Sequence, residues 1–350
     1  MAVPLESPPL FRNLPIYLFT QEPIPTFTAR LVVIRFSFNG SFQTSKASSM
    51  SSPSFQSGRL RIAVAGASGR VGTALVASLS GDSVDVVALT RDPTNRRLPA
   101  GIETAAVDFD IASTLSEALV GIDRLFISHG TSDRQVANEI AIIDAAVAVG
   151  VPHIVKLSAM GPPTRLHPFD WHMKIEAHLA AQDIGFTALR PGTFVDTLAR
   201  AGGPVASDTW GGTAGSGRVN LIDTRDIAEV ARVALLEDQF LQSQRAYHLT
   251  GPTAVSMPEV AEELSRLLGR PVEYRHRSIA EHRQALIGSG VSEMLADLIL
   301  GLDRLFKESV MAESTATFSE LTGQNPRSVA DWLTDNLSLF QTKPQPVAVT

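Results

Sequence analysis

Three glycines follow the apolar segment 60–65 at intervals of three residues, in the sequence Gly66-Ala-Ser-Gly-Arg-Val-Gly72. In a dinucleotide-binding turn, the first glycine allows the tight passage from strand to helix. The second lets the backbone approach the pyrophosphate, and the third lets the helix pack closely on the strand. The helix that follows directs its free amides at the phosphates. Gly66, Gly69 and Gly72 therefore predict a pyrophosphate site. A glycine triplet alone is equally compatible with a structural turn, so the strand and helix patterns around it determine which interpretation is favoured.

An arginine occupies the position that contacts the adenosine ribose in dinucleotide-binding proteins. A second apolar segment, 84–90, ends about 20 residues past the glycines, and Arg91 follows it. An acidic side chain here would accept hydrogen bonds from a free 2'-hydroxyl, whereas a guanidinium pairs with a 2'-phosphate. Arg91 therefore favours NADP(H) over NAD(H). Arg70, Arg96 and Arg97 could add positive charge nearby or could be solvated loop residues.

The chain lacks the tyrosine–lysine pair of typical short-chain dehydrogenases, in which a lysine four residues after the tyrosine lowers the pKa of the phenol. Its three tyrosines, Tyr17, Tyr247 and Tyr274, have no lysine four residues on, and Asp170 stands four residues before Lys174. Tyrosine-dependent chemistry on alcohols or ketones is therefore disfavoured.

The catalytic residue stays unknown, with Ser158, His172 and Lys174 as candidates. Ser158 ends the fifth predicted strand and is expected to face the nicotinamide or a substrate carbonyl, but it lacks the Gly-x-Ser-x-Gly elbow of a serine hydrolase. Hydride transfer needs positioning and a proton source rather than a nucleophile. A quinone, an azo bond or an activated double bond could take its proton from water.

His172 and Glu176 share one face of a helix expected over 170–178. Their spacing would also suit two metal ligands, but no third ligand completes a zinc pattern. We therefore expect no metal and interpret the two residues as a surface pair or a supporting pair.

Apolar segments and helical patterns alternate from residue 60 to residue 192. This alternation predicts an α/β fold of Rossmann type: a doubly wound parallel sheet with helices on both faces and ligands at the carboxyl ends of the strands. Strands are expected near 60–65, 84–90, 102–107, 123–128, 153–157 and 186–189.

Beyond residue 192 the pattern predicts a smaller, mostly helical C-terminal substrate lobe. Helices are expected near 225–236, 257–269, 279–288, 292–306 and 328–338. The apolar face of the segment 291–306 could line a substrate pocket or could pack in the core. We expect a nucleotide-binding core over 58–200, a substrate-binding lobe over 201–340 that is interleaved with the core, and a tail over 341–350.

The 350-residue chain is 44% hydrophobic, has a net charge of −6 and contains no cysteine. These values predict a globular protein with a sizeable core and give no electrostatic footprint for nucleic acid. Disulfides and thiol chemistry are excluded, so a reducing, cytoplasmic location is expected. No apolar run is long enough to cross a bilayer, so neither nucleic acid nor a membrane is an expected partner. The oligomeric state cannot be inferred from the sequence.

The first 57 residues differ in composition from the rest. They are rich in Pro, Ser, Thr and Phe, and we expect them to be disordered. Their basic residues permit an organellar transit segment, although early acids and scattered prolines do not form an amphipathic arginine helix. An over-extended start, with Met50 as the functional first residue, is an equal alternative.

Together, these motifs resemble those of the NmrA-like family of atypical short-chain dehydrogenases, from about residue 60 to residue 340. That family includes NADPH-dependent quinone reductases and azoreductase-like and triphenylmethane-reductase-like proteins. The similar segments are 66–72, 90–93, 107–109, 156–159, 172–176, 187–194, 223–228, 249–252 and 321–326.

The resemblance implies positions for the cofactor. The pyrophosphate site would comprise Gly66, Ser68, Gly69, Arg70, Val71 and Gly72. The 2'-phosphate would lie at Arg91, the adenine at Asp108 and Phe109, and the nicotinamide ribose at Ser128, His129 and Lys156 to Ser158. The nicotinamide would lie beside Pro191, Thr193 and Phe194. Asn95 stands where quinone-reductase-like relatives can carry a second basic residue, which leaves the strength of 2'-phosphate selection open, and Arg96 could substitute for it.

The resemblance also implies a function. We expect an NAD(P)H-dependent oxidoreductase that transfers hydride to a small hydrophobic acceptor of quinone-like, aromatic or conjugated character. Two alternatives remain open at this point: a non-catalytic NAD(P)-sensing regulatory protein of the NmrA type, and a specialised reductase or isomerase of a secondary-metabolite pathway.

Overall fold

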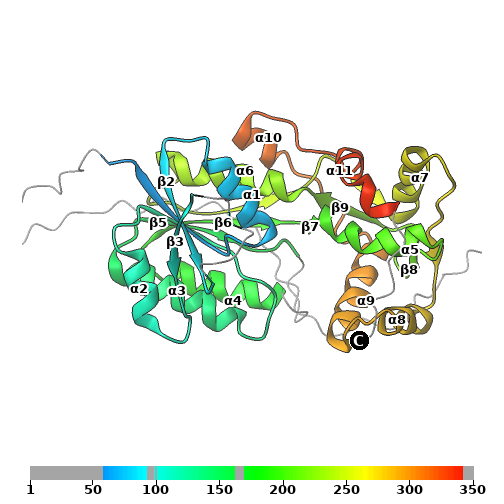
Figure 1. Ribbon diagram of the computed structural model, residues 1–350, viewed down its shortest axis with the longest axis horizontal. Coiled ribbons are helices and arrows are strands. Elements are labelled where there is room, and N and C mark those ends of the chain that lie inside the picture. The colour runs from blue at the N-terminus through cyan, green and yellow to red at the C-terminus, as the bar shows by residue number, and fades with distance from the viewer. Residues whose placement is uncertain (1–57, 93–97, 99–100, 162–168, 342–350) are drawn as a thin grey trace, which may run out of the picture. The chain divides into compact units, whose positions relative to one another are not determined.

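A computed structural model describes residues 58–92, 98, 101–161 and 169–341 (Figure 1). They belong to one compact unit that spans Gln56–Thr350. The expectations for residues 1–57, Asn95, Arg96, Arg97 and the tail beyond residue 341 lie outside the described residues. The division at residues 200 and 201 remains a prediction.

The centre of this unit is a seven-stranded parallel sheet in the order β10-β6-β5-β4-β1-β2-β3. Its strands are β1 Leu60–Ala65, β2 Val84–Thr90, β3 Glu103–Ala106, β4 Arg124–Ile127, β5 His153–Leu157, β6 Gly185–Pro191 and β10 Gln244–Leu249. The strand order reverses between β1 and β4, both of which pair with parallel register. Ligands of such sheets bind at this reversal, beyond the carboxyl ends of the strands. The predicted α/β fold is confirmed.

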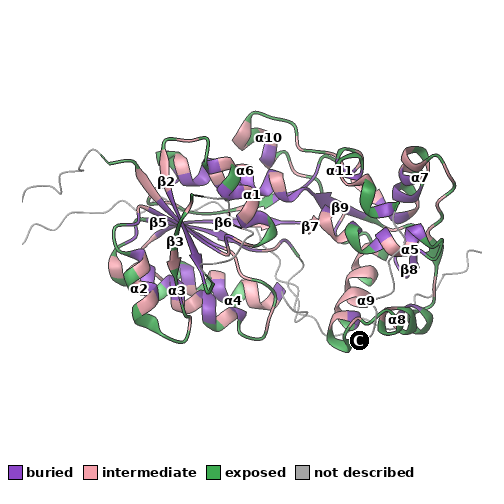
Figure 2. Ribbon diagram, in the orientation of Figure 1, coloured by how far each residue is buried: buried purple, intermediate pink, exposed green. Residues whose placement is uncertain are grey.

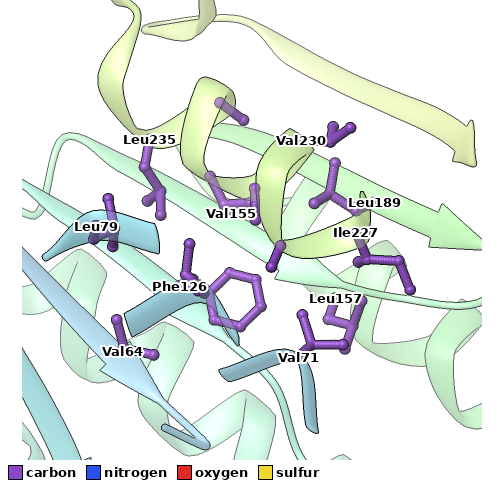
Figure 3. Packing of buried hydrophobic residues seen from close by; sticks show 14 of the residues in the cluster. Val64, Val71, Leu79, Phe126, Val155, Leu157, Leu189, Ile227, Val230 and Leu235 are labelled. Carbon is purple, nitrogen blue, oxygen red and sulfur yellow. The ribbon is translucent and has the colours of Figure 1, made fainter. Parts of the chain in front are cut away.

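Helices cover both faces of the sheet (Figure 1). The helices α1 Arg70–Leu79 and α6 Thr224–Leu236 lie on one face, and α10 Thr317–Thr322 packs beside α6. The helices α2 Ala112–Leu119, α3 Gln135–Val149 and α4 Phe169–Ala180 lie on the other face. Figure 3 shows the core under α1 and α6, where Phe126 of β4 is fully buried among Leu79, Val155 and Ile227.

The strand β10 was not predicted, although it completes the sheet. Its sequence, Gln-Arg-Ala-Tyr-His-Leu, contains no apolar run, and most of its residues are exposed. The inner strands β5 and β6 are in contrast mostly buried (Figure 2). An edge strand pairs on one side only, so its residues need not be buried on both faces. Together with α6, β10 brings a segment of the second half of the chain into the seven-stranded sheet and the core packed on it.

The remaining elements belong to the second half of the chain, where a third hydrophobic cluster contains Trp210, Trp332 and Phe340. They include the three-stranded sheet β7 Thr193–Phe194, β9 Arg218–Ile222 and β11 Ala254–Ser256, and the two-stranded sheet β8 Gly211–Gly212 and β12 Arg275–His276. The helices are α5 Gly202–Ala206, α7 Met257–Leu268, α8 Ile279–Gly288, α9 Glu293–Lys307 and α11 Val329–Asp335. The longer helices match their predicted ranges, whereas the short strands have too few residues to give a period-2 pattern. Within the described ranges, no helix is both long enough and apolar enough to span a membrane.

Candidate cofactor and active site

The turn after β1 requires glycine at two of the three predicted positions. Gly66 has a φ of +81°, and a Cβ on it would lie 2.2 Å from the carbonyl oxygen of Ser128. A Cβ on Gly72 would lie 2.1 Å from the carbonyl oxygen of Gly66. The amide of Gly69 donates to that same oxygen at 2.9 Å, which closes the turn. The turn therefore has the tight backbone geometry that the spacing predicted.

The helix α1 begins at this turn without a cap. Its N-cap residue, Gly69, makes no side-chain capping bond, and the first turn carries no acid. Asp223 caps α6, and serines cap α7, α8, α9 and α11, whereas α2, α3, α5 and α10 also begin without a side-chain cap. An uncapped first turn leaves amides available for an anion, so this helix start can hold a pyrophosphate.

The predicted adenosine residues lie along the same edge of the sheet. Arg91 follows the end of β2 and is exposed, and Asp108 and Phe109 come soon after β3. Phe109 contacts the ring of His129, which follows β4, in an edge-to-face pair at 5.8 Å. His129 is also within 2.9 Å of the Asn138 amide of α3. These residues can therefore border one extended ligand.

Backbone hydrogen bonds fix the residues next to the glycine turn 66–72, which we call the cradle. The amide of Ser128 donates to Ala65 at 3.1 Å, which joins the end of β4 to the start of the cradle. Pro191 accepts from the amide of Met160 at 2.8 Å, and Thr193 and Phe194 form β7. Ser68, Arg70 and Val71 occupy the turn and the first residues of α1, with Val71 buried and Arg70 exposed.

The side chain of Lys156 is completely buried. Its ammonium lies 2.6 Å from Glu139 Oε2 of α3, and Glu139 is also fully buried. The same Nζ donates to the carbonyl oxygen of Leu157 at 2.6 Å and lies 3.3 Å from His172 Nδ1. Lys156 thus connects β5 to α3 and α4. Its predicted place beside the nicotinamide ribose remains an expectation.

A second polar cluster, formed by Ser158, Glu176 and Arg190, lies near the contacts of Lys156. The Ser158 hydroxyl donates a short hydrogen bond to Glu176 Oε1, and Arg190 of β6 donates from Nε to both Glu176 oxygens at 3.1 Å. The Glu176 carboxylate holds the pKa of Arg190 above its usual value. Because the Ser158 proton goes to Glu176, the lone pairs of the hydroxyl oxygen are what Ser158 can offer to another group.

The three catalytic candidates separate into two groups. Ser158 and His172 lie between β5 and α4, where His172 has a pKa lowered to about 3 by burial and by the charge of Lys156. Lys174 lies on the exposed face of α4 and pairs with Asp170 at 3.2 Å. The structure therefore does not bring Lys174 together with the other two.

Sequence reasoning missed Gln135, Glu139 and Arg190. The signal available for Glu139 was a lysine inside the apolar strand 153–157, because a buried ammonium requires an acidic partner. The interpretation of His172 and Glu176 as a supporting pair agrees with their contacts to Lys156 and Arg190. Among the described residues, no group of three His, Asp or Glu side chains is placed to hold a metal.

A groove of about 550 Å³ borders this region, between α4 and the strands β6 and β10. Its lining combines the apolar residues Phe169 and Met173 with His172, Glu176 and Arg190. The end of the groove near Phe169 lies at the carboxyl edge of the sheet. The residues predicted to contact the cofactor lie along the same edge. An apolar groove with a few polar side chains is suited to a small organic molecule.

A parallel sheet whose strand order reverses beside a glycine cradle defines a Rossmann-type dinucleotide-binding protein. A family model described as the NmrA-like family matches residues 59–333, and the chain belongs to this family. The resemblance predicted from the motifs is confirmed.

Two relatives cover most of the chain. It is 32% identical over 284 residues to an NAD(P)H azoreductase of Xenophilus azovorans, a match that covers 80% of this chain and 99% of the relative. It is 28% identical over 277 residues to quinone oxidoreductase 2 of Escherichia coli, with coverage of 77% and 96%. Because both relatives are oxidoreductases, the expected enzyme class is confirmed at the level of the family.

Solved structures agree with these relatives. An NADPH-dependent quinone oxidoreductase of Escherichia coli, complexed with NADPH, gives a TM-score of 0.73 at 26% identity, covering 79% of this chain and 99% of that one. The triphenylmethane reductase of a Citrobacter species, complexed with NADP(H), gives a TM-score of 0.72 at 21% identity, covering 78% and 99%, and shows the shared fold. A nicotinamide dinucleotide is therefore the cofactor class of this protein.

Proposed function

We propose that this protein is an NADPH-dependent reductase of small hydrophobic molecules with an aromatic or quinone-like acceptor group. The observation that carries the proposal is the cradle, in which Gly66 and Gly72 have no room for a Cβ and α1 begins without a cap. The relatives named for azo and quinone reduction support the acceptor class.

The cofactor would lie along the carboxyl edge of the sheet, from Arg91 past Gly69 to the end of β5. Backbone amides at the start of α1 would hold the pyrophosphate, and Phe109 would pack against the adenine. When bound there, the nicotinamide supplies a hydride. The protein's contribution is to hold the two reactants in place and to keep water away from them.

The acceptor molecule would occupy the end of the groove nearest Phe169 and His172. Apolar side chains there favour a flat hydrophobic body, and His172 offers a polar contact. Glu176 is engaged by Ser158 and Arg190, so its charge is compensated and opposes less the negative charge that develops on the acceptor.

The preference for NADPH rests on Arg91. An exposed guanidinium at the end of β2 pairs with the 2'-phosphate of NADPH and gains nothing from the 2'-hydroxyl of NADH. Replacing it by alanine should weaken NADPH binding by about 1–3 kcal/mol, or roughly 5- to 150-fold, and leave NADH unchanged. Equal weakening of both nucleotides would contradict this assignment.

The experiment measures NADPH and NADH binding to the full chain by titration, and then the loss of nicotinamide absorbance with a panel of quinones and azo compounds. Arg304→Ala, which removes an exposed arginine on α9, is the matched control for Arg91→Ala. NADPH-selective binding with turnover would support the proposal. Binding without turnover of any acceptor would favour the alternative, a dinucleotide-sensing regulatory protein.

A further inference from the structure

The buried ammonium of Lys156 has its contacts inside the protein. Its Nζ forms an ion pair with Glu139 Oε2 at 2.6 Å and hydrogen bonds with the carbonyl oxygen of Leu157 at 2.6 Å and Nδ1 of His172 at 3.3 Å. A lysine ammonium only donates hydrogen bonds. His172 Nδ1 must therefore be the acceptor and carry no proton.

This contact fixes the tautomer of the imidazole. With Nδ1 unprotonated, the single proton of neutral His172 lies on Nε2. A second proton on Nδ1 would point at the Lys156 ammonium, so the doubly protonated ring is disfavoured as well. Burial and the charge of Lys156 accordingly lower the pKa of His172 to about 3.

The Nε2–H group has no acceptor among the described residues. Its neighbour is the side-chain nitrogen of Gln135, at 3.4 Å; one N–H of that amide donates to Glu139 Oε1 at 2.9 Å, and the other faces His172. Both ring nitrogens of His172 therefore face a donor, and only one of them can accept. The charged ammonium is the stronger donor, so Nδ1 accepts and Nε2 keeps the proton. Turning the Gln135 amide around would give His172 an acceptor but would set two acceptor oxygens together at Glu139. Glu139 therefore fixes the orientation of Gln135 and leaves the His172 donor unpaired.

His172 also lines the groove, so a molecule bound there is the candidate acceptor for this N–H. We propose that Glu139 and Lys156 are positioning residues that hold His172 as the neutral Nε2–H tautomer, and that this N–H donates to the oxygen or nitrogen of the hydride acceptor. The donor role rests on the proposed function.

The chemistry balances without a protein proton. A quinone gains a hydride from the reduced nicotinamide, which is oxidised, and one quinone oxygen gains the negative charge. The His172 N–H stabilises that charge by a hydrogen bond, and water then supplies the proton. In the part of the chain that the structure describes, the groups that contact His172 are Lys156 from β5 and Gln135 from α3, and Glu139 of α3 contacts both of them. Glu176, one turn further along α4, is paired with Arg190 of β6.

The tautomer is tested by NMR of the cofactor-free protein labelled with ¹⁵N-histidine, where His172→Gln assigns the signal. Long-range ¹H–¹⁵N spectra distinguish the two neutral tautomers from the imidazolium. We expect the Nε2–H tautomer from pH 5 to pH 8. An imidazolium at pH 6, or the Nδ1–H tautomer, would overturn the proposal whether or not a substrate is known.

Two variants test the positioning residues in the same spectra. Lys156→Met should release the ring, so that His172 titrates closer to 6.5 and both tautomers are present. If the unpaired Glu139 prevents folding, the double variant Lys156→Met/Glu139→Leu removes both charges and keeps the site apolar. An unchanged His172 spectrum in either folded variant would refute the role of Lys156.

The donor role is tested by kinetics with a quinone that the protein reduces. His172→Gln should lower kcat at least about tenfold, with the NADPH Kd within about twofold of wild type. His178→Gln is the matched control, since His178 lies on the same helix and contacts Asp144 outside the groove. In the variant that lacks Lys156, the acid limb of kcat/KM should move to a higher pH than in the wild type. A kcat unchanged in His172→Gln would overturn the donor role.

Discussion

Alanine at residue 72 should disrupt the cofactor site through a backbone clash. Its Cβ would lie 2.1 Å from the carbonyl oxygen of Gly66 and 2.9 Å from Cα of Ala67. Ordinary contact begins near 3.4 Å, so the helix must move from the turn by about 1.3 Å. The helix cannot withdraw freely, because its inner face, including Leu75 and Leu79, is fully buried. Overpacking of this kind costs about 1–3 kcal/mol of stability.

The same displacement would separate the α1 amides from a bound pyrophosphate. Since each factor of ten in Kd is about 1.4 kcal/mol, the loss of one phosphate hydrogen bond predicts NADPH binding weaker by about tenfold or more. Fluorescence titration gives the Kd, and urea unfolding gives the stability. The control is Gly81→Ala, just after α1, where the nearest atom lies at an ordinary 3.7 Å. Affinity within about twofold of wild type in Gly72→Ala would refute the cradle.

Three further predictions follow from the buried and exposed charges. His153 is fully buried with its pKa lowered to about 4, chiefly by burial, so the unfolded chain binds its proton first and stability falls as pH drops from 6.5 towards 4. At pH 5 the loss is about 2 kcal/mol, and urea unfolding of His153→Gln should show a flatter pH dependence. Arg327→Ala should destabilise the protein by about 1–3 kcal/mol because the fully buried Asp226 loses its guanidinium partner, as chemical denaturation can measure; no change would contradict this. Lys174→Ala should leave kcat and KM within about twofold of the wild-type values. A large loss of kcat would show that this exposed residue belongs to the active site.

The central fold was predictable because its signals are local. Each inner strand is a short apolar segment, and the cradle glycines follow one of them directly. The strand β10 has mixed polarity because it lies at an edge, so the parallel pairing with β6 could not be read from its sequence. What decides its structure is a partner strand more than 50 residues earlier in the chain.

The candidate site was predictable in its cofactor half and less so in its chemistry. The cradle is one continuous segment, whereas Lys156 meets Glu139 and His172 only through the packing of three separate elements. Helical spacing paired His172 with Glu176 correctly as residues of one face. It could not show that one would turn to Lys156 and the other to Arg190.

The late position of α6 and β10 in the sequence has a consequence for synthesis of the protein. The helix α6 buries Ile227, Val230 and Leu235 over β4 and β5, which leave the ribosome many residues earlier (Figure 3). Until residue 249 emerges, the sheet has an open edge beside β6 and an apolar face half covered. Such surfaces favour association with other chains. Folding of the nucleotide-binding half is therefore expected to be completed after most of the chain has been made, and a nascent chain stalled before α6 should depend on chaperones.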